Sequence, residues 1–304
     1  MCRILPAQFL SSSVLVGMAV LTIPCLADGP ADGQVHAEQG DAAWERFSAL
    51  PIWDDGLSEM SYYDATDTIY GTQRKYTRVH LLNREWMNAE TGVKAEPPDT
   101  ARDVAVFKFT LAEEIPTENY NYRYLITAFA RRPGLEPFKL TVSSQDWCGH
   151  TFKHLRWRDG KVAVQSFSYF DDGDRQWELP GEAVPFELLP LLARAVVASG
   201  ASREVNLLTP LRSNRGVEPR ASNARLATPG DRYPVQVPAG RFEVHRVTLT
   251  SASPETWFEV ESDAPFRLIA FQIGRVTGRL RLVERRAYWD RSAKSEFHAP
   301  GKAP

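Results

Sequence analysis

The sequence HLRWRDGKVAV, residues 154–164, decides the fold class. Asp159-Gly160 at its centre favours a two-residue turn in which both residues have positive φ. Such a turn predicts these cross-strand pairs: Arg158 with Lys161, Trp157 with Val162, Leu155 with Val164, and His154 with Gln165. One face of the hairpin is then apolar and the other polar, as in an antiparallel sheet that covers a core with one face.

Strand-like runs of the same kind extend in both directions from this hairpin. They are rich in β-branched and aromatic residues, and several alternate apolar with polar side chains. The runs are residues 104–111, 120–130 and 138–144 before the hairpin, and residues 242–250 and 256–260 after it. The last two are predicted to form a second hairpin. The sequence therefore predicts a mainly-β fold.

One stretch, PFELLPLLARAVVAS (residues 185–199), predicts a helix that ends at a glycine, Gly200, in the C-cap position. Pro190 either begins the regular part of this helix or kinks it. The stretch is apolar around most of its circumference, so other elements must cover it. We therefore predict a strongly curved antiparallel sheet, a half-barrel, wrapped around one helix. A weaker helix is predicted over residues 43–50.

The N-terminus has the pattern of a secretory signal peptide. Arg3 precedes an apolar run at residues 14–23, which is about half the length that a membrane-spanning helix needs. Small residues at Cys25 and Ala27 predict cleavage after residue 27, and therefore export to the periplasm or the extracellular space. The alternative, a lipid anchor on Cys25, is disfavoured by Pro24. No later segment is apolar for long enough to span a membrane.

The rest of the chain divides into three parts. Residues 28–42 read as a flexible leader, residues 43–291 as the mainly-β domain, and residues 292–304 as a disordered tail. A turn-rich stretch at residues 213–223 leaves open a division into two subdomains near 200–225. Removal of Arg3 with the signal leaves 35 of the 36 basic residues against 38 acidic ones. This near-neutral balance argues against a nucleic-acid partner.

Two segments carry a resemblance to known families. SSQDWCGHTFKHL (residues 143–155), together with residues 69–82 and 119–130, resembles uncharacterised exported bacterial proteins with a Ser-Ser-Gln-acid-Trp-Cys-Gly segment. Some of these proteins are labelled septum-formation inhibitors, and the similarity covers roughly residues 53–192. Residues 237–249 and 256–270 are similar to the repeated hairpins of periplasmic half-barrel proteins, including the lipoprotein-carrier class. This second resemblance implies a curved sheet that wraps a helix and holds an apolar ligand.

Cys148 and His150 are the candidate catalytic or metal-ligating residues. Cys148 is the only cysteine after the predicted cleavage site, so no disulfide within the mature chain can stabilise the fold. On a strand, Cys148, His150 and His154 would point to one face, and Cys148 and His150 could share a metal ion or form a nucleophile pair. Gly149 between them predicts a β-bulge. The alternative is a half-buried cysteine with two histidines on the face of a strand.

Aromatic side chains are the candidate ligand-binding residues. They crowd the first half of the chain and include Tyr70, Tyr120, Tyr122, Tyr124, Trp147, Trp157 and Tyr169. Most belong in the core, but in an incompletely filled curved sheet some would line a cavity. The candidates are Trp147, Trp157, Tyr122 and Tyr124.

The sequence therefore predicts an exported binding or carrier module for an apolar or lipid-like ligand. The common enzyme signatures, the phosphate-binding glycine loop and the dinucleotide fingerprint are absent, which favours a function without catalysis and without a cofactor. Two alternatives stay open. One is an enzyme or metal-binding protein centred on Cys148 and His150, and the other is a structural interaction component of the cell envelope.

Overall fold

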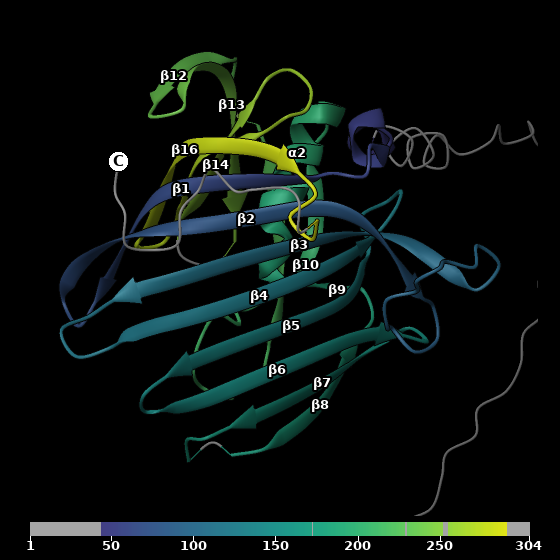
Figure 1. Ribbon diagram of the computed structural model, residues 1–304, viewed down its shortest axis with the longest axis vertical. Helices are drawn as coiled ribbons and strands as arrows, with labels where there is room; N and C mark the ends of the chain where they lie inside the picture. Colours follow the sequence, from purple (N-terminus) through teal and green to yellow (C-terminus); the bar gives the residue numbers. More distant parts are fainter. Residues whose placement is uncertain (1–43, 172, 229, 252–254, 291–304) are drawn as a thin grey trace, which may run out of the picture.

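The computed structural model describes residues 44–290 except 172, 229 and 252–254 (Figure 1). The signal peptide and leader predicted for residues 1–42 lie outside the described residues, as does the tail predicted for residues 292–304.

The first half of the described chain is an antiparallel meander of eight strands, each paired with the next. Their bounds are β1 (Ser58–Ile69), β2 (Thr72–Asn88), β3 (Asp103–Pro116), β4 (Asn121–Arg131), β5 (Pro137–Asp146), β6 (Gly149–Arg158), β7 (Lys161–Ser168) and β8 (Arg175–Pro180). The predicted pairs of the β6–β7 hairpin are all observed, with Asp159 and Gly160 at φ 54° and 72°.

The second half continues the same sheet from the other side of β1. Its strands are β9 (Ala183–Val184), β10 (Arg203–Leu208), β11 (Ala221–Ala227), β12 (Tyr233–Val237), β13 (Gly240–Thr250), β14 (Thr256–Glu261), β15 (Leu268–Ile273) and β16 (Val276–Arg286). The sheet runs β8 to β1 and then β16-β15-β14-β13-β11-β10-β9, and β12 pairs with β13. The predicted hairpin of β13 and β14 is confirmed. The stretch at residues 213–223 leads from β10 into β11, two neighbouring strands of this one sheet.

The sheet curls into a nearly closed barrel, which confirms the predicted mainly-β fold around one helix. Its two edge strands, β8 and β9, are joined by a short turn. Trp157 on β6, two strands in from the β8 edge, donates its indole N–H to the carbonyl of Ala183 on the other edge strand, β9 (2.7 Å).

Short helices lie on the concave side of the sheet. A helical turn over residues 44–48 and η1 (Pro51–Asp54) precede β1, and η2 (Phe186–Leu188) leads directly into α2 (Leu189–Ser199). Pro190 lies in the first turn of α2, so it begins the helix and does not kink it. Gly200 ends the helix at φ 72°, and its N–H donates to the carbonyl of Val196.

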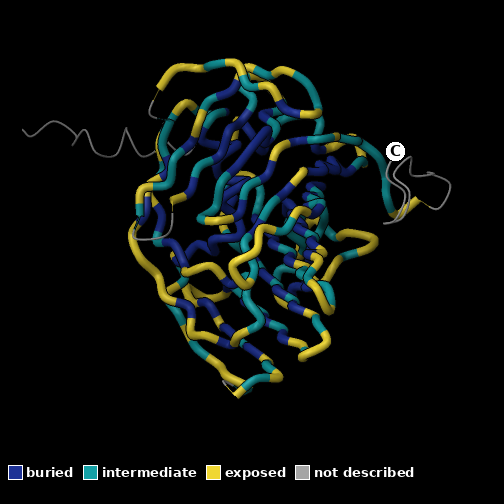
Figure 2. Tube along the Cα trace, turned by 90° about the vertical axis from the view of Figure 1, so that its left-hand side faces the viewer, coloured by how far each residue is buried: buried dark blue, intermediate teal, exposed yellow. Residues whose placement is uncertain are grey.

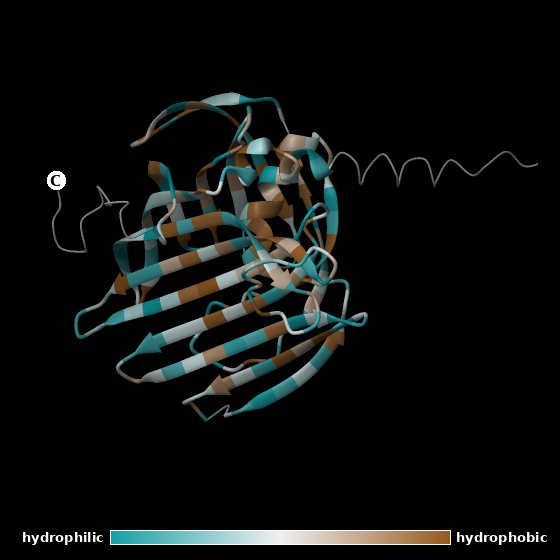
Figure 3. Cartoon of the chain, turned by 45° about the vertical axis from the view of Figure 1, so that its right-hand side comes forward, coloured by the Kyte–Doolittle hydropathy of each residue, from teal (hydrophilic) through white to brown (hydrophobic). Residues whose placement is uncertain are grey.

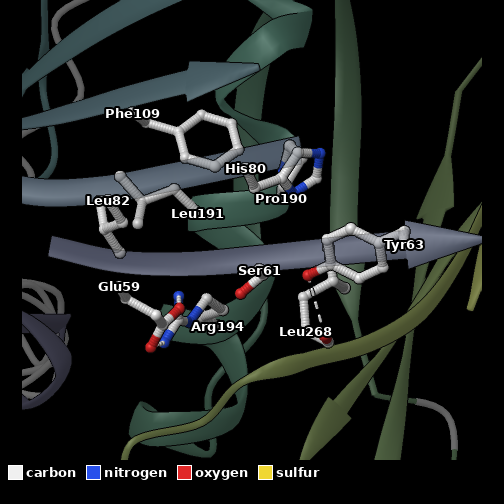
Figure 4. A pocket seen from close by; sticks show the side chains of 10 residues that line it. All are labelled: Glu59, Ser61, Tyr63, His80, Leu82, Phe109, Pro190, Leu191, Arg194 and Leu268. Atoms are coloured by element: carbon white, nitrogen blue, oxygen red, sulfur yellow. Dashed lines mark hydrogen bonds and ion pairs between the residues drawn. The ribbon is translucent and has the colours of Figure 1, made fainter. Parts of the chain in front are cut away.

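One hydrophobic cluster fills the interior and includes side chains from α2 and from both halves of the sheet. Figure 2 shows the buried residues running through the middle of the molecule, and Figure 3 shows the alternation of hydropathy along the strands. A cavity beside α2, lined by residues that include Glu59, His80 and Arg194, has a volume of only about 10 Å³ (Figure 4). This is at most the space for one water molecule. The side chains of α2 thus belong to the packed core of the sheet.

Candidate functional site: an aromatic rim on the hairpin turns

Four hairpin turns gather at one end of the meander, because alternate turns of consecutive antiparallel strands fall at the same end (left side of Figure 1). They connect β1 to β2, β3 to β4, β5 to β6, and β7 to β8. Each turn carries aromatic side chains at its tip or on the next strand position. We call this set the aromatic rim: Tyr70, Tyr120, Tyr122, Trp147, Tyr169 and Phe170.

The rim displays large aromatic surfaces to solvent. Trp147 is 80% exposed, Tyr70 77% and Tyr169 70%. The ring of Trp147 stacks on that of Tyr120, with 5.9 Å between centroids and 23° between planes. Burial of aromatic area is a major source of folding energy, so side chains left this open need another explanation. The stacked pair forms a flat, exposed platform on which a ligand can lie.

A chain of hydroxyl groups borders this platform. The hydroxyls of Tyr70 and Tyr122 are 2.5 Å apart, those of Tyr122 and Tyr120 are 3.5 Å apart, and the Tyr120 hydroxyl is 2.8 Å from Sγ of Cys148. Burial, together with the hydrogen bond to Tyr120, raises the pKa of Tyr122 to about 12. The hydrogen bond to Cys148 raises the pKa of Tyr120. The phenols are therefore protonated at neutral pH and can both donate to and accept from a ligand.

Cys148 lies in a turn and not on a strand, which corrects the placement expected from the sequence. Trp147 and Cys148 form the two-residue loop between β5 and β6. Asp146 holds this loop, because its Oδ1 accepts the backbone N–H groups of Cys148 (2.7 Å) and Gly149 (3.0 Å). The predicted bulge at Gly149 is also wrong, since the β5–β6 register runs without a shift through the pair Asp146–Gly149.

Gly149 instead leaves the space that a rim residue, Tyr169, fills. A Cβ atom at this position would lie 2.2 Å from the ring of Tyr169, so only glycine lets that ring pack over the backbone. The backbone N–H of Tyr169 donates to the carbonyl of His150 (3.2 Å). The β5–β6 and β7–β8 turns are joined in this way.

The two histidines near Cys148 lie on β6. His150 is exposed, and its Nε2 is within hydrogen-bond distance of Ser143 Oγ (3.1 Å). His154 is half-buried, and this burial is the main cause that lowers its pKa. Among the described residues, no three His, Cys, Asp or Glu side chains gather as a group that could hold a metal ion.

The other predicted ligand-binding residues are less accessible than Trp147. Trp157 is buried in the core and its indole N–H is already bonded to Ala183. Tyr124 faces inward and is covered by the guanidinium of Arg212, 4.7 Å from its ring centroid. Tyr122 is 8% exposed and reaches the rim through its hydroxyl group. The structure therefore brings Trp147 and Tyr122 together in the rim. Trp157 lies at the other end of β6, next to the β6–β7 turn, and takes no part in the rim.

A buried ionic network underlies the rim, and the sequence analysis missed it. Arg212 bonds Glu113 on β3 and Asp67 on β1 (3.1 Å to Asp67), and Arg78 lies 3.4 Å from the same Glu113. Burial alone would raise the pKa of Glu113, but Arg212 and Arg78 outweigh it and lower this pKa. The two-residue alternation along each strand could have revealed this network. Asp67 faces the same side of β1 as Tyr63, and Glu113 faces the same side of β3 as Phe109, so both carboxylates point inward.

The segment that carries Arg212 closes the sheet below the rim. Lys153 on β6 donates from Nζ to the carbonyls of Leu211 (2.8 Å) and Ser213 (2.9 Å). Arg215 on the same segment pairs with Asp171 (3.0 Å) and covers the ring of Phe170 at 4.3 Å. Charged side chains from the first half of the sheet and from the segment that follows β10 therefore fix the rim from beneath.

The fold defines a protein whose nearly closed, mainly antiparallel sheet forms a barrel-like body around a short helix. A solved structure of similar fold is the β-barrel-like protein of domain of unknown function DUF1849 from Brucella abortus. The two are 9% identical with a TM-score of 0.47, and the match covers 75% of this chain and 97% of the other. No protein-family model matches the sequence, and no curated protein matches it either. Within the described ranges, no helix has the length and apolar character to cross a bilayer.

Proposed function

We propose that this protein is an exported binding module that holds an amphipathic, lipid-like ligand on its aromatic rim. The observation that carries the proposal is the stacked Trp147–Tyr120 platform, 80% exposed at Trp147, with the row of phenol hydroxyls beside it. The apolar face of a ligand would lie on the rings, and its polar groups would bond the hydroxyls of Tyr70 and Tyr122. Export rests on the signal peptide predicted for residues 1–27.

The filled interior supports a surface site over an enclosed one. Cavities that enclose a drug-sized ligand have volumes of a few hundred Å³. The cavity that Glu59, His80 and Arg194 line is about 10 Å³, so a ligand at that place inside the sheet would have to displace the helix. Arg194 of α2 is fixed by Glu59 and by two backbone carbonyls, which opposes such a displacement.

The test is a titration of the mature protein, residues 28–304, with monolauroylglycerol below its critical aggregation concentration. This probe is uncharged, so it reports on the rim and not on charged surfaces. Tryptophan fluorescence should change on binding, and Trp147→Ala should weaken the affinity by about tenfold, as for the loss of one aromatic anchor.

Trp289→Ala is the matched control, because Trp289 is also exposed (52%) but lies outside the rim. This variant should bind the probe as the wild type does. Equal losses in the two variants, or no binding by the wild type, would refute the proposal. A rim that binds no lipid-like molecule but retains a protein from envelope extracts would instead favour an interaction component.

A further inference from the structure

We infer that three cationic side chains on the convex face of the sheet form a binding site for a phosphate-type anion, independent of the aromatic rim. They are Arg131 at the end of β4, Lys139 on β5 and Arg156 on β6, which we call the cationic cluster. These strands are neighbours in the sheet (Figure 1), and the cluster lies toward the ends opposite the rim turns.

Strand register brings the three charges together. Lys139 and Arg156 are directly opposite each other in the β5–β6 ladder. Their neighbours Leu140 and Leu155 are buried in the core, so the two cations point to the outer face. The guanidinium groups of Arg156 and Arg131 both lie over the ring of Phe138, at 3.8 and 4.9 Å from its centroid.

No carboxylate neutralises this cluster within the described part of the chain. Arg131 has no ion pair or side-chain hydrogen bond there. Lys139 donates to the carbonyl of Gly92 (3.1 Å), and Arg156 to the carbonyls of Phe138 (3.0 Å) and Ala89 (2.9 Å). Like charges directly opposite on a sheet are unfavourable. Cations elsewhere on the same sheet, such as Lys108, Arg123 and Lys161, have carboxylate partners.

Electrostatics agrees with the geometry. Burial and the charge of Arg156 lower the pKa of Lys139, and burial together with Arg131 and Arg158 lowers that of Arg156. Burial and a neighbouring cation therefore both act on Lys139 and on Arg156, and a bound anion would offset the repulsion between the cations. Within the described ranges, none of the five N–H donors of Arg131 is bonded, and Lys139 retains two.

The donors suit a group with several acceptor oxygens. Guanidinium groups bind phosphate oxygens through paired N–H bonds, and Lys adds a point charge. Arg156 is fixed by its two carbonyl bonds and packs closely against Gly92, whose φ is +66° and where a Cβ atom would lie 2.7 Å from the guanidinium carbon. Arg156 is thus the fixed member of the cluster, while Arg131 and Lys139 offer free donors. The ligand class is a phosphate group, either free or in a lipid headgroup.

The experiment compares the wild type with the double variant Arg131→Gln/Lys139→Gln. Inorganic phosphate should raise the thermal midpoint of the wild type above that in sodium chloride of equal ionic strength. For an equal rise in the thermal midpoint, the double variant should need at least about tenfold more phosphate, because it lacks the charged hydrogen bonds of Arg131 and Lys139 to the anion. In a second arm, flotation tests both proteins with phosphatidylglycerol vesicles and with phosphatidylcholine vesicles.

The matched control is Arg123→Gln/Lys161→Gln, which removes the same net charge from cations that are paired with Glu114 and Glu178. It should retain the wild-type response. A response to phosphate without vesicle binding identifies a free phosphate compound, and binding confined to phosphatidylglycerol vesicles identifies a headgroup. The inference is overturned if neither arm distinguishes the wild type from the cluster variant, or if the control loses the response equally.

Discussion

Arg194 on α2 and Glu59 on β1 form a bidentate ion pair inside the barrel, with N–O distances of 2.6 and 3.1 Å. Both side chains are nearly inaccessible, at 6% and 4% exposure. The guanidinium also donates to the carbonyls of Phe266 (2.7 Å) and Pro265 (2.9 Å). One charged residue therefore ties the central helix to both halves of the sheet.

Breaking this pair should destabilise the protein strongly. Glu59→Gln leaves the arginine charge buried and unpaired, and we expect a loss of about 3–5 kcal/mol in the free energy of unfolding, measured by urea denaturation. Replacing both residues by Met should cost far less, because no uncompensated charge remains. Glu114→Gln, at the exposed pair with Arg123, is the control and should change stability little. Similar losses in the single and double variants would contradict this account.

His80 should make the protein less stable in mild acid. Its ring lies between those of Tyr63 and Phe109, and its Nε2 accepts a hydrogen bond from Arg78 Nε (3.1 Å). Burial, with Arg78 and Arg194, lowers the pKa of His80 well below 6.5. The folded state thus binds fewer protons than the unfolded chain below pH 6.5, and stability falls as the pH decreases from that value.

The loss due to this histidine can reach about 1.4 kcal/mol per pH unit. Urea unfolding of the wild type and of His80→Gln at pH values from 7.5 to about 4.5 isolates its contribution. The variant should show the smaller decline in stability. Parallel curves for the two proteins would mean that His80 does not titrate differently in the folded and unfolded states.

The elements that the sequence predicts well are those specified by local signals. The Asp159-Gly160 turn and the apolar alternation around it set the β6–β7 register, and Gly200 sets the end of α2. The pairing of β1 with β16, such as Tyr63 with Leu280, joins residues more than two hundred positions apart. No local pattern encodes that pairing, so near-closure of the barrel was beyond the sequence argument.

The candidate site was predictable only in part. Aromatic content marked Trp147 and Tyr122, but their accessibility depends on which turns share an end of the sheet. Cys148 was misplaced because an Asp side chain, here Asp146, can end a strand by capping a tight loop. The ionic partners Asp67 and Arg212 come from segments that meet only in the folded sheet.

Gly278 on β16 should not tolerate a side chain. It faces Phe271 on β15 across the ladder, and a Cβ atom would lie 2.2 Å from that buried ring. Gly278→Ala should therefore lower the unfolding free energy by about 1–3 kcal/mol. In a Phe271→Leu background the same change should cost much less, because the smaller side chain leaves space. Additive effects in this double-mutant cycle would show that the ring is not the obstacle.

The thiol of Cys148 should react readily in the native protein, which tests the enzyme or metal alternative directly. The residue is exposed, and its partners among the described residues are the Tyr120 hydroxyl and Asp146 of its own turn. With Ellman's reagent, native protein of residues 28–304 should release one equivalent of thiol on the timescale of the unfolded chain, and Cys148→Ser should release none. A metal held by Cys148 and His150 would protect the thiolate, so EDTA would then accelerate the reaction. We expect the same rate with and without EDTA. A faster rate with the chelator would support the alternative that Cys148 and His150 hold a metal ion.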